Sequence, residues 1–118
     1  MGINSTEVAY GFGQLGSTYT TSSAAAIIPP TGKVFIAITV LDAAKFDADG
    51  FESETPTKFI NGSTTIANDL AAGAETTDGG SGGVQVPATQ EFPKGVTIYG
   101  RWTELDLAAG AIIAYIGE

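Results

Sequence analysis

The sequence predicts an all-β protein, folded as an antiparallel sandwich or small barrel in a single domain. Ile, Val and Thr supply 32 of the 118 residues, against 21 for Leu, Met, Lys, Arg, Glu and Gln together. β-Branched residues fit a pleated, half-buried surface, whereas the second group favours helices. The 16 glycines are scattered every few residues and would interrupt most helices of useful length. A chain of this length has the size of one domain, so residues 1–118 are expected to fold as a unit.

The most apolar predicted strand is Lys33–Leu41, which follows the turn residues Pro29–Gly32. A strand that is apolar on both faces belongs in the centre of a structure. A C-terminal hairpin is also predicted, with arms at Gly95–Leu105 and Ala111–Gly117 joined by Asp106–Gly110. Apolar and polar residues alternate in the first arm, which is typical of a half-buried strand.

Gly100 falls on the apolar side of that first arm. We expect a β-bulge there, or a gap that makes room for a neighbouring Trp102. The side chains expected in the core are Phe35, Ile38, Ile98, Trp102 and Ile113. Weaker strands are expected at Glu7–Phe12, Tyr19–Thr21, Ala25–Ile28, Thr57–Asn61 and Val84–Pro87, with an exposed loop at Asp78–Gly83.

The composition excludes much catalytic chemistry. The chain has no Cys and no His, which rules out disulfides, thiol nucleophiles, Cys/His zinc sites and Ser-His-Asp triads. We therefore expect no enzyme, no catalytic residue and no cofactor. The net charge of −8 would repel a phosphate backbone, so nucleic acid is not an expected partner. No apolar stretch approaches the ~18–20 residues of a membrane span, and Met1–Asn4 does not resemble the start of a signal peptide. Synthesis in the cytoplasm and no membrane partner are expected.

Four carboxylates fall within Asp47–Glu54. Three interpretations stay open: a solvated acidic turn, a weak Ca²⁺ site, and a carboxylate pair that acts on a sugar. The spacing differs from an EF-hand loop, because Gly50 is fourth and Lys58 is twelfth counted from Asp47. The solvated turn is the simplest of the three, and no metal site is assigned.

Other patterns are expected to be coincidental. Gly11–Gly16 fits G-x-G-x-x-G, but its continuation Ser17–Thr21 is a poor helix start, so a glycine-rich turn is predicted. Asn4-Ser5-Thr6 and Asn61-Gly62-Ser63 fit the N-glycosylation sequon in a chain with no recognisable export signal.

Four stretches, Tyr10–Ser17, Pro29–Ile38, Phe92–Thr103 and Ile112–Gly117, resemble small virion structural proteins of tailed bacteriophages. These include capsid decoration (cement) proteins, which are typically β-rich and often trimeric and lie on the outer capsid lattice. The resemblance implies a cement protein that stabilises the lattice, located on the outer surface of the virion. Its implied partners are the major capsid protein and itself, as a homotrimer.

The alternative function is a glycan- or receptor-binding module of a phage tail or head fibre. Exposed aromatic residues such as Tyr10, Tyr19 or Tyr99, with nearby acids, would then contact a sugar. The simpler interpretation is that these tyrosines are half-buried strand residues whose hydroxyls reach water. The N-terminal segment is the candidate interface, either as an arm that reaches a capsid subunit or sister chain, or as a segment tied down by its own fold. Its residues are Met1, Gly2, Ile3, Asn4, Ser5 and Thr6.

Overall fold

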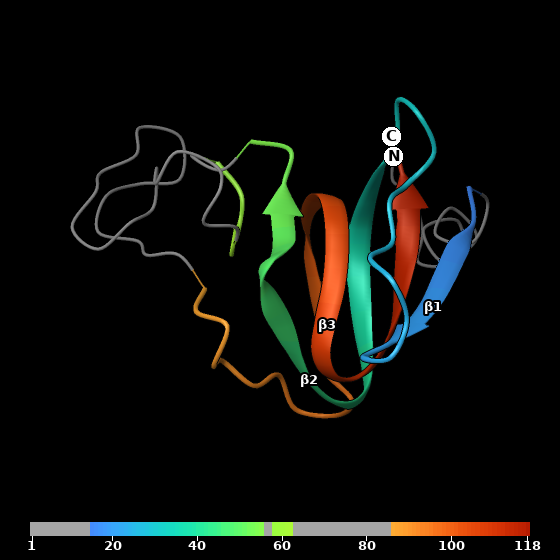
Figure 1. Cartoon of the computed structure of the whole chain (residues 1–118). Helices are drawn as coiled ribbons and strands as arrows, with labels where there is room; N and C mark the ends of the chain where they lie inside the picture. Colours follow the sequence, from blue (N-terminus) through green and yellow to red (C-terminus); the bar gives the residue numbers. More distant parts are fainter. Residues whose placement is uncertain (1–14, 56–57, 63–85) are drawn as a thin grey trace, which may run out of the picture.

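The computed structural model describes residues 15–55, 58–62 and 86–118, in which three strands form one antiparallel sheet (Figure 1). Strand β1 spans Ser17–Thr21, β2 spans Val34–Ser53 and β3 spans Thr97–Gly117, in the order β1-β3-β2. The described residues contain no helix, which confirms the prediction of an all-β, antiparallel, single-domain fold. The described strands form a single sheet that curls over itself, and not the two separate sheets of a sandwich.

β2 and β3 are long and bent, so each contributes two segments to the sheet (Figure 1). The first half of β2 has β3 on both sides, since Ile38 pairs with Ala114 on one edge and with Ile98 on the other. The second half of β2 pairs with the middle of β3, where Phe51 lies opposite Leu105. The central position predicted for Lys33–Leu41 is therefore confirmed.

The predicted C-terminal hairpin is wrong. β3 runs without interruption, and Asp106–Gly110 lies within it instead of forming a turn. Leu107 is buried there, and Gly110 takes the bend with a φ of 87°. A Cβ on Gly110 would lie 2.3 Å from the main-chain oxygen of Ala43. Alternation in sequence is the same for a hairpin and for one bent strand. Here the two arms pair with opposite edges of β2 instead of with each other.

The core lies inside the curl of the sheet. Phe46, Phe51 and Trp102 stack in a row, with ring centroids 4.2 and 5.2 Å apart. The connection between β1 and β2 closes this core, because Ile27 packs against it and exchanges two main-chain hydrogen bonds, of 2.8 and 3.0 Å, with Leu105.

The expected core residues are confirmed in part. Phe35, Ile38 and Trp102 are all completely buried. Ile98 and Ile113 are only half-buried. Ile98 packs against the margin of the core near the start of β3, and Ile113 lies on the opposite side of the sheet. The alternation of residues shows which side chains share a face of the strand, but not which face is buried. Ile113 lies on the outer face.

Both expectations for Gly100 are confirmed. A Cβ at this position would lie 2.8 Å from the Trp102 ring, so the absence of a side chain makes room for the indole. There is also a β-bulge, because β3 has two residues between Tyr99 and Trp102 where β2 has one between their partners Ala37 and Phe35.

Of the weaker strands, Tyr19–Thr21 is confirmed as part of β1. Ala25–Ile28 is reduced to a single β-bridge at Ile27, since the prolines that follow cannot donate to a ladder. Residues 58–61 and 86–87 are the described parts of two further predicted strands, and neither segment is a strand. Their hydrogen bonds are isolated bonds within turns, to side chains or between the two segments, and they do not form a ladder with a neighbouring strand. Outside the described residues lie Met1–Thr6, Glu7–Phe12, most of Gly11–Gly16, and Asp78–Gly83.

Candidate interaction surface

The outer face of the first half of the sheet is built from two rows of uncharged residues. Directly paired residues on antiparallel strands project to the same side, and the pairing places four residues from three strands in each row. One row is Ser17, Tyr115, Ala37 and Tyr99, and the next is Tyr19, Ile113, Thr39 and Thr97. We call these eight residues the tyrosine face.

The aromatic rings of this face are well placed for contact with another molecule. Tyr19 and Tyr99, at its two margins, are each 63% exposed, and Tyr115 is half-buried between them. The hydroxyls of Thr39 and Thr97 hydrogen-bond to each other at 3.0 Å. The alternate residues of β2 and β3 face the core, so the sheet that carries this face is packed from behind.

The outer face of the second half of the sheet is acidic. Between Phe46 and Phe51, four residues of β2 lie opposite the single residue Asp106 of β3, which makes a large, irregular bulge. Beyond the bulge Glu52 pairs directly with Glu104. We call the acids of this region the acidic ribbon: Asp47, Asp49, Glu52, Glu104 and Asp106.

The turn interpretation of Asp47–Glu54 is wrong, because all but the last of these residues belong to β2. Gly50 is buried against β3, and a Cβ there would lie 2.5 Å from the main-chain oxygen of Asp106. Glycine is needed here for the close approach within the bulge. Within residues 15–55, 58–62 and 86–118, no group of three or more potential metal-ligating side chains is placed to hold a metal ion.

Carboxylates in the acidic ribbon oppose one another's ionisation. Burial raises the pKa of Glu52, and the neighbouring carboxylates of Glu104 and Asp49 raise it further. Burial likewise raises the pKa of Asp106, with Asp47 adding to the effect. At neutral pH this half of the outer face carries concentrated negative charge at a cost in stability.

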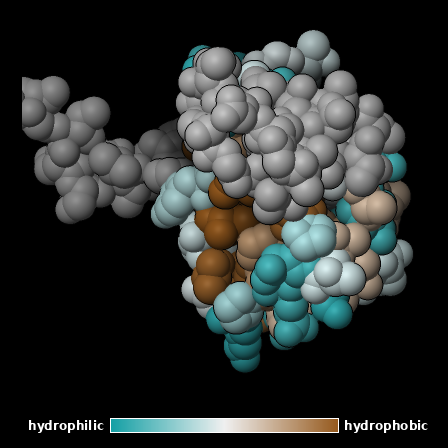
Figure 2. Space-filling model, turned by 90° about the vertical axis from the view of Figure 1, so that its left-hand side faces the viewer, coloured by the Kyte–Doolittle hydropathy of each residue, from teal (hydrophilic) through white to brown (hydrophobic). Residues whose placement is uncertain are grey.

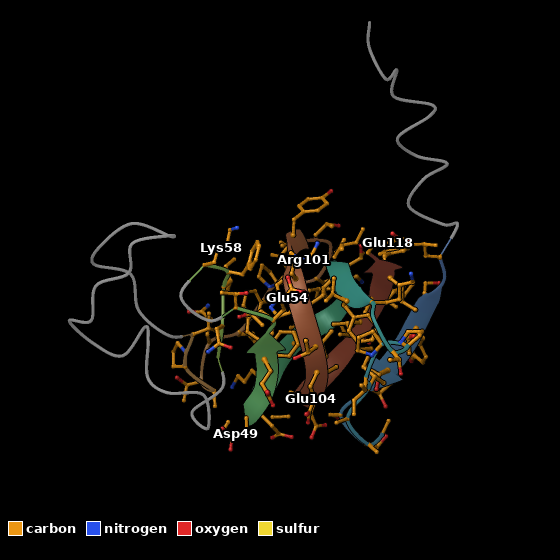
Figure 3. All side chains as sticks on the ribbon, turned by 90° about the horizontal axis from the view of Figure 1, so that it is seen from above. Asp49, Glu54, Lys58, Arg101, Glu104 and Glu118 are labelled. Carbon is orange, nitrogen blue, oxygen red and sulfur yellow. The ribbon has the colours of Figure 1, made fainter. Side chains whose placement is uncertain are left out.

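An ion pair lies near the other end of the same strands. The guanidinium of Arg101 donates through Nε and Nη2 to the carboxylate of Glu54, and its Nη2 also donates to the main-chain oxygen of Glu118 at 2.8 Å. Hydrogen bonding from Arg101 lowers the pKa of Glu54. Figure 3 shows Arg101 and Glu54 together, and Asp49 and Glu104 on the opposite side of the molecule in that view.

Hydrophobic atoms also reach the surface on the side where β2 ends, beside polar ones (Figure 2). Among the large hydrophobic residues, Ile28 is 70% exposed and Ile60 is 45% exposed, but neither lies in a strand. Tyr19 and Tyr99 are each 63% exposed and share one uncharged face of paired strands. The tyrosine face is therefore the stronger candidate among the described residues.

Sequence reasoning found part of this surface. Half-buried strand positions are the simpler expectation for Tyr19 and Tyr99, and exposure is expected only for a sugar site; both residues are exposed. Tyr10 lies outside the described residues. Sequence reasoning missed Tyr115, although the two-residue spacing from Ile113 already places both on one face. It also missed the pairing of Glu52 with Glu104, which depends on a register that local sequence does not encode.

Comparison with protein-family models, curated proteins and solved structures finds no significant match to this chain. Among the described residues, no helix has the length and apolar character needed to cross a membrane.

Proposed function

We propose that this chain is a virion structural protein of a tailed bacteriophage, a capsid decoration protein that binds and stabilises the outer capsid lattice. The observation that carries the proposal is the tyrosine face, an uncharged surface with Tyr19 and Tyr99 strongly exposed. The centres of protein interfaces are depleted in charged residues and enriched in aromatic ones, tyrosine among them. The tyrosine face meets the major capsid protein, and the acidic ribbon faces solvent.

The resemblance to small phage structural proteins and the composition support the same function. A protein on the outer lattice needs no affinity for DNA, in keeping with a net charge of −8. It needs no catalysis either, and the chain lacks the Cys and His on which most nucleophilic and general-base chemistry depends.

The test is the number of copies of this chain in each purified virion, measured by quantitative gel densitometry against the major capsid protein. Decoration predicts a copy number comparable with that of the major capsid protein. A count lower by an order of magnitude or more would overturn decoration in favour of a fibre component, and absence from the particle would reject both.

We further propose a homotrimer. A domain of this size has little stability to spare and gains by association, and the short edge strand β1 is a surface that a neighbouring chain can cover. Sedimentation equilibrium should give three times the chain mass of 12.0 kDa. A concentration-independent monomer would contradict this assignment.

The N-terminal segment Met1–Thr6 remains our candidate arm for attachment. Deletion of Gly2–Thr6 should leave the protein folded, as judged by circular dichroism, and weaken its binding to undecorated capsids. Equal binding of the deleted and full-length chains would reject the arm.

The second candidate function is a glycan- or receptor-binding module of a fibre. The exposed rings of Tyr19 and Tyr99, with the paired hydroxyls of Thr39 and Thr97 on the same face, favour it, since sugar rings stack on aromatic faces and bond to hydroxyls. Titration with host surface polysaccharide distinguishes the two, because only the glycan module predicts saturable binding that is lost in Tyr99→Ser.

A further inference from the structure

Residues 58–62 are held against the sheet by hydrogen bonds to both long strands. The indole Nε1 of Trp102 donates to the main-chain oxygen of Ile60 at 3.1 Å. The main-chain nitrogen of Ser53 donates to the side-chain oxygen of Asn61 at 3.0 Å, and Gly62 nitrogen donates to the oxygen of Phe51 at 2.7 Å. Asn61 is only 3% exposed, so the segment is fastened through a buried amide.

The two residues at the centre of this contact have separate structural reasons to be there. Asn61 supplies the side-chain oxygen that satisfies Ser53 nitrogen. Gly62 is needed for space, since a Cβ would lie 3.0 Å from Phe51 Cβ and 3.1 Å from the oxygen of Val86. The fold therefore requires an Asn-Gly pair, the dipeptide in which an asparagine amide is chemically most labile because glycine leaves its own nitrogen unhindered.

The chemistry of that pair is a cyclisation followed by hydrolysis. The main-chain nitrogen of Gly62 gives up its proton to solvent and attacks Cγ of Asn61, so that a new C–N bond forms and ammonia leaves. Water then opens the resulting five-membered imide at one of its two carbonyls, which gives aspartate or isoaspartate at position 61. The net change is consumption of one water molecule and release of one ammonia molecule.

The folded protein opposes each requirement of this reaction. The proton that Gly62 must lose is engaged with Phe51, the Asn61 side chain is anchored to Ser53, and burial keeps hydroxide and water away from the amide. We propose that Asn61-Gly62 is a latent deamidation site, silent while residues 58–62 are docked and converted irreversibly once they open.

The product would not dock as the asparagine does. Aspartate would place a carboxylate where the side chain is almost fully buried, which is costly without full hydrogen bonding. In isoaspartate the main chain runs through Cβ and Cγ of residue 61 and is one carbon longer before Gly62, which donates to Phe51. The carbonyl whose oxygen accepts from Val86 at 3.0 Å leaves the main chain and becomes a free carboxylate, so both hydrogen bonds lose their present geometry. Either product favours the open segment, whatever partner the protein binds.

The test compares deamidation of the purified full chain in mildly alkaline buffer with and without denaturant, followed by mass mapping of the peptide that contains position 61. Because reaction requires local opening, the folded protein should react at least about tenfold more slowly than the unfolded one. Equal rates, or no reaction at Asn61 in the unfolded chain, would overturn the proposal.

A pair of variants separates local opening from general loss of stability. Trp102→Phe keeps an aromatic ring in the stack and removes the donor to Ile60, so it loosens residues 58–62 directly. Ile112→Val is the control, because it destabilises the buried part of the sheet where Ile112 pairs with Val40. The two variants are compared in buffers that give them the same free energy of unfolding, so that a difference in rate reports local opening. Faster deamidation in Trp102→Phe than in the control is expected. Equal rates would show that only global unfolding exposes Asn61-Gly62 and would contradict control by local opening of residues 58–62.

Discussion

The two faces of the sheet are made by the same strands with the same alternation, yet one face is buried and the other is largely exposed. The inner face is closed by the chain itself: Trp102 and Phe51 stack there, and Ile27 of the β1–β2 connection packs against the same core. The outer face carries Tyr19 and Tyr99 with most of their surface exposed. Periodicity therefore identifies residues that share a face, whereas closure of the fold decides which face remains available to a partner.

The largest effect is expected on the inner face. Trp102→Ala removes the largest fully buried side chain and its bond to Ile60, so it should cost about 3–5 kcal/mol of unfolding free energy. For a domain of marginal stability this approaches unfolding. Urea denaturation followed by circular dichroism measures it. A loss under about 1 kcal/mol would mean that the core is not organised around this ring.

A smaller loss is expected where the inner face needs an absent side chain. Gly100→Ala would place its Cβ 2.8 Å from the Trp102 ring and should cost about 1–3 kcal/mol. In a Trp102→Phe background the clashing ring atoms are gone, so the same substitution should cost less. Equal costs in both backgrounds, measured by the same denaturation, would rule out the indole as the reason for glycine.

The charged residues outside the tyrosine face should give effects of opposite sign. Glu52→Gln removes repulsion with Glu104 and should stabilise the protein by up to about 1 kcal/mol at neutral pH. Glu54→Gln weakens the contact with Arg101 and should destabilise it by about 0–1 kcal/mol.

Both effects should fade in acid, for different reasons. Folding raises the pKa of Glu52, so protonation of this carboxyl favours the folded state. That contribution to stability is fully present below the ordinary glutamate pKa and is lost as pH rises through the raised value. Folding lowers the pKa of Glu54, so its contribution is present above the ordinary pKa and is lost as pH falls through the lowered value. Thermal denaturation from neutral to acid pH tests both, and a Glu52→Gln variant less stable than the parent at neutral pH would contradict the repulsion.

The part of the fold that sequence predicted is the part that local patterns determine. Continuous apolarity identified the central segment Lys33–Leu41, and the isolated Gly100 identified both a bulge and the space for Trp102. The hairpin failed because alternation does not distinguish two paired arms from one bent strand whose arms pair with a third segment. Likewise, the acids of Asp47–Glu54 are evident in the sequence, but their partners Glu104 and Asp106 depend on a long-range register and on the large bulge.

The smallest effect on stability is expected on the outer face. Tyr19→Ser and Tyr99→Ser remove exposed rings, so each should change the unfolding free energy by about 0.5 kcal/mol or less. A loss comparable with that of Trp102→Ala would show that these rings belong to the chain's own packing and not to a contact surface.

The same tyrosines give the most direct test of the proposed function: binding of the double variant Tyr19→Ser, Tyr99→Ser to undecorated capsids. Ile28→Ser is the matched control, because Ile28 is 70% exposed and lies outside the tyrosine face. The proposal predicts that the double variant binds at least about tenfold more weakly while the control binds like the parent, since aromatic anchors carry most interface energy. Parental affinity in the double variant would contradict a capsid contact through the tyrosine face.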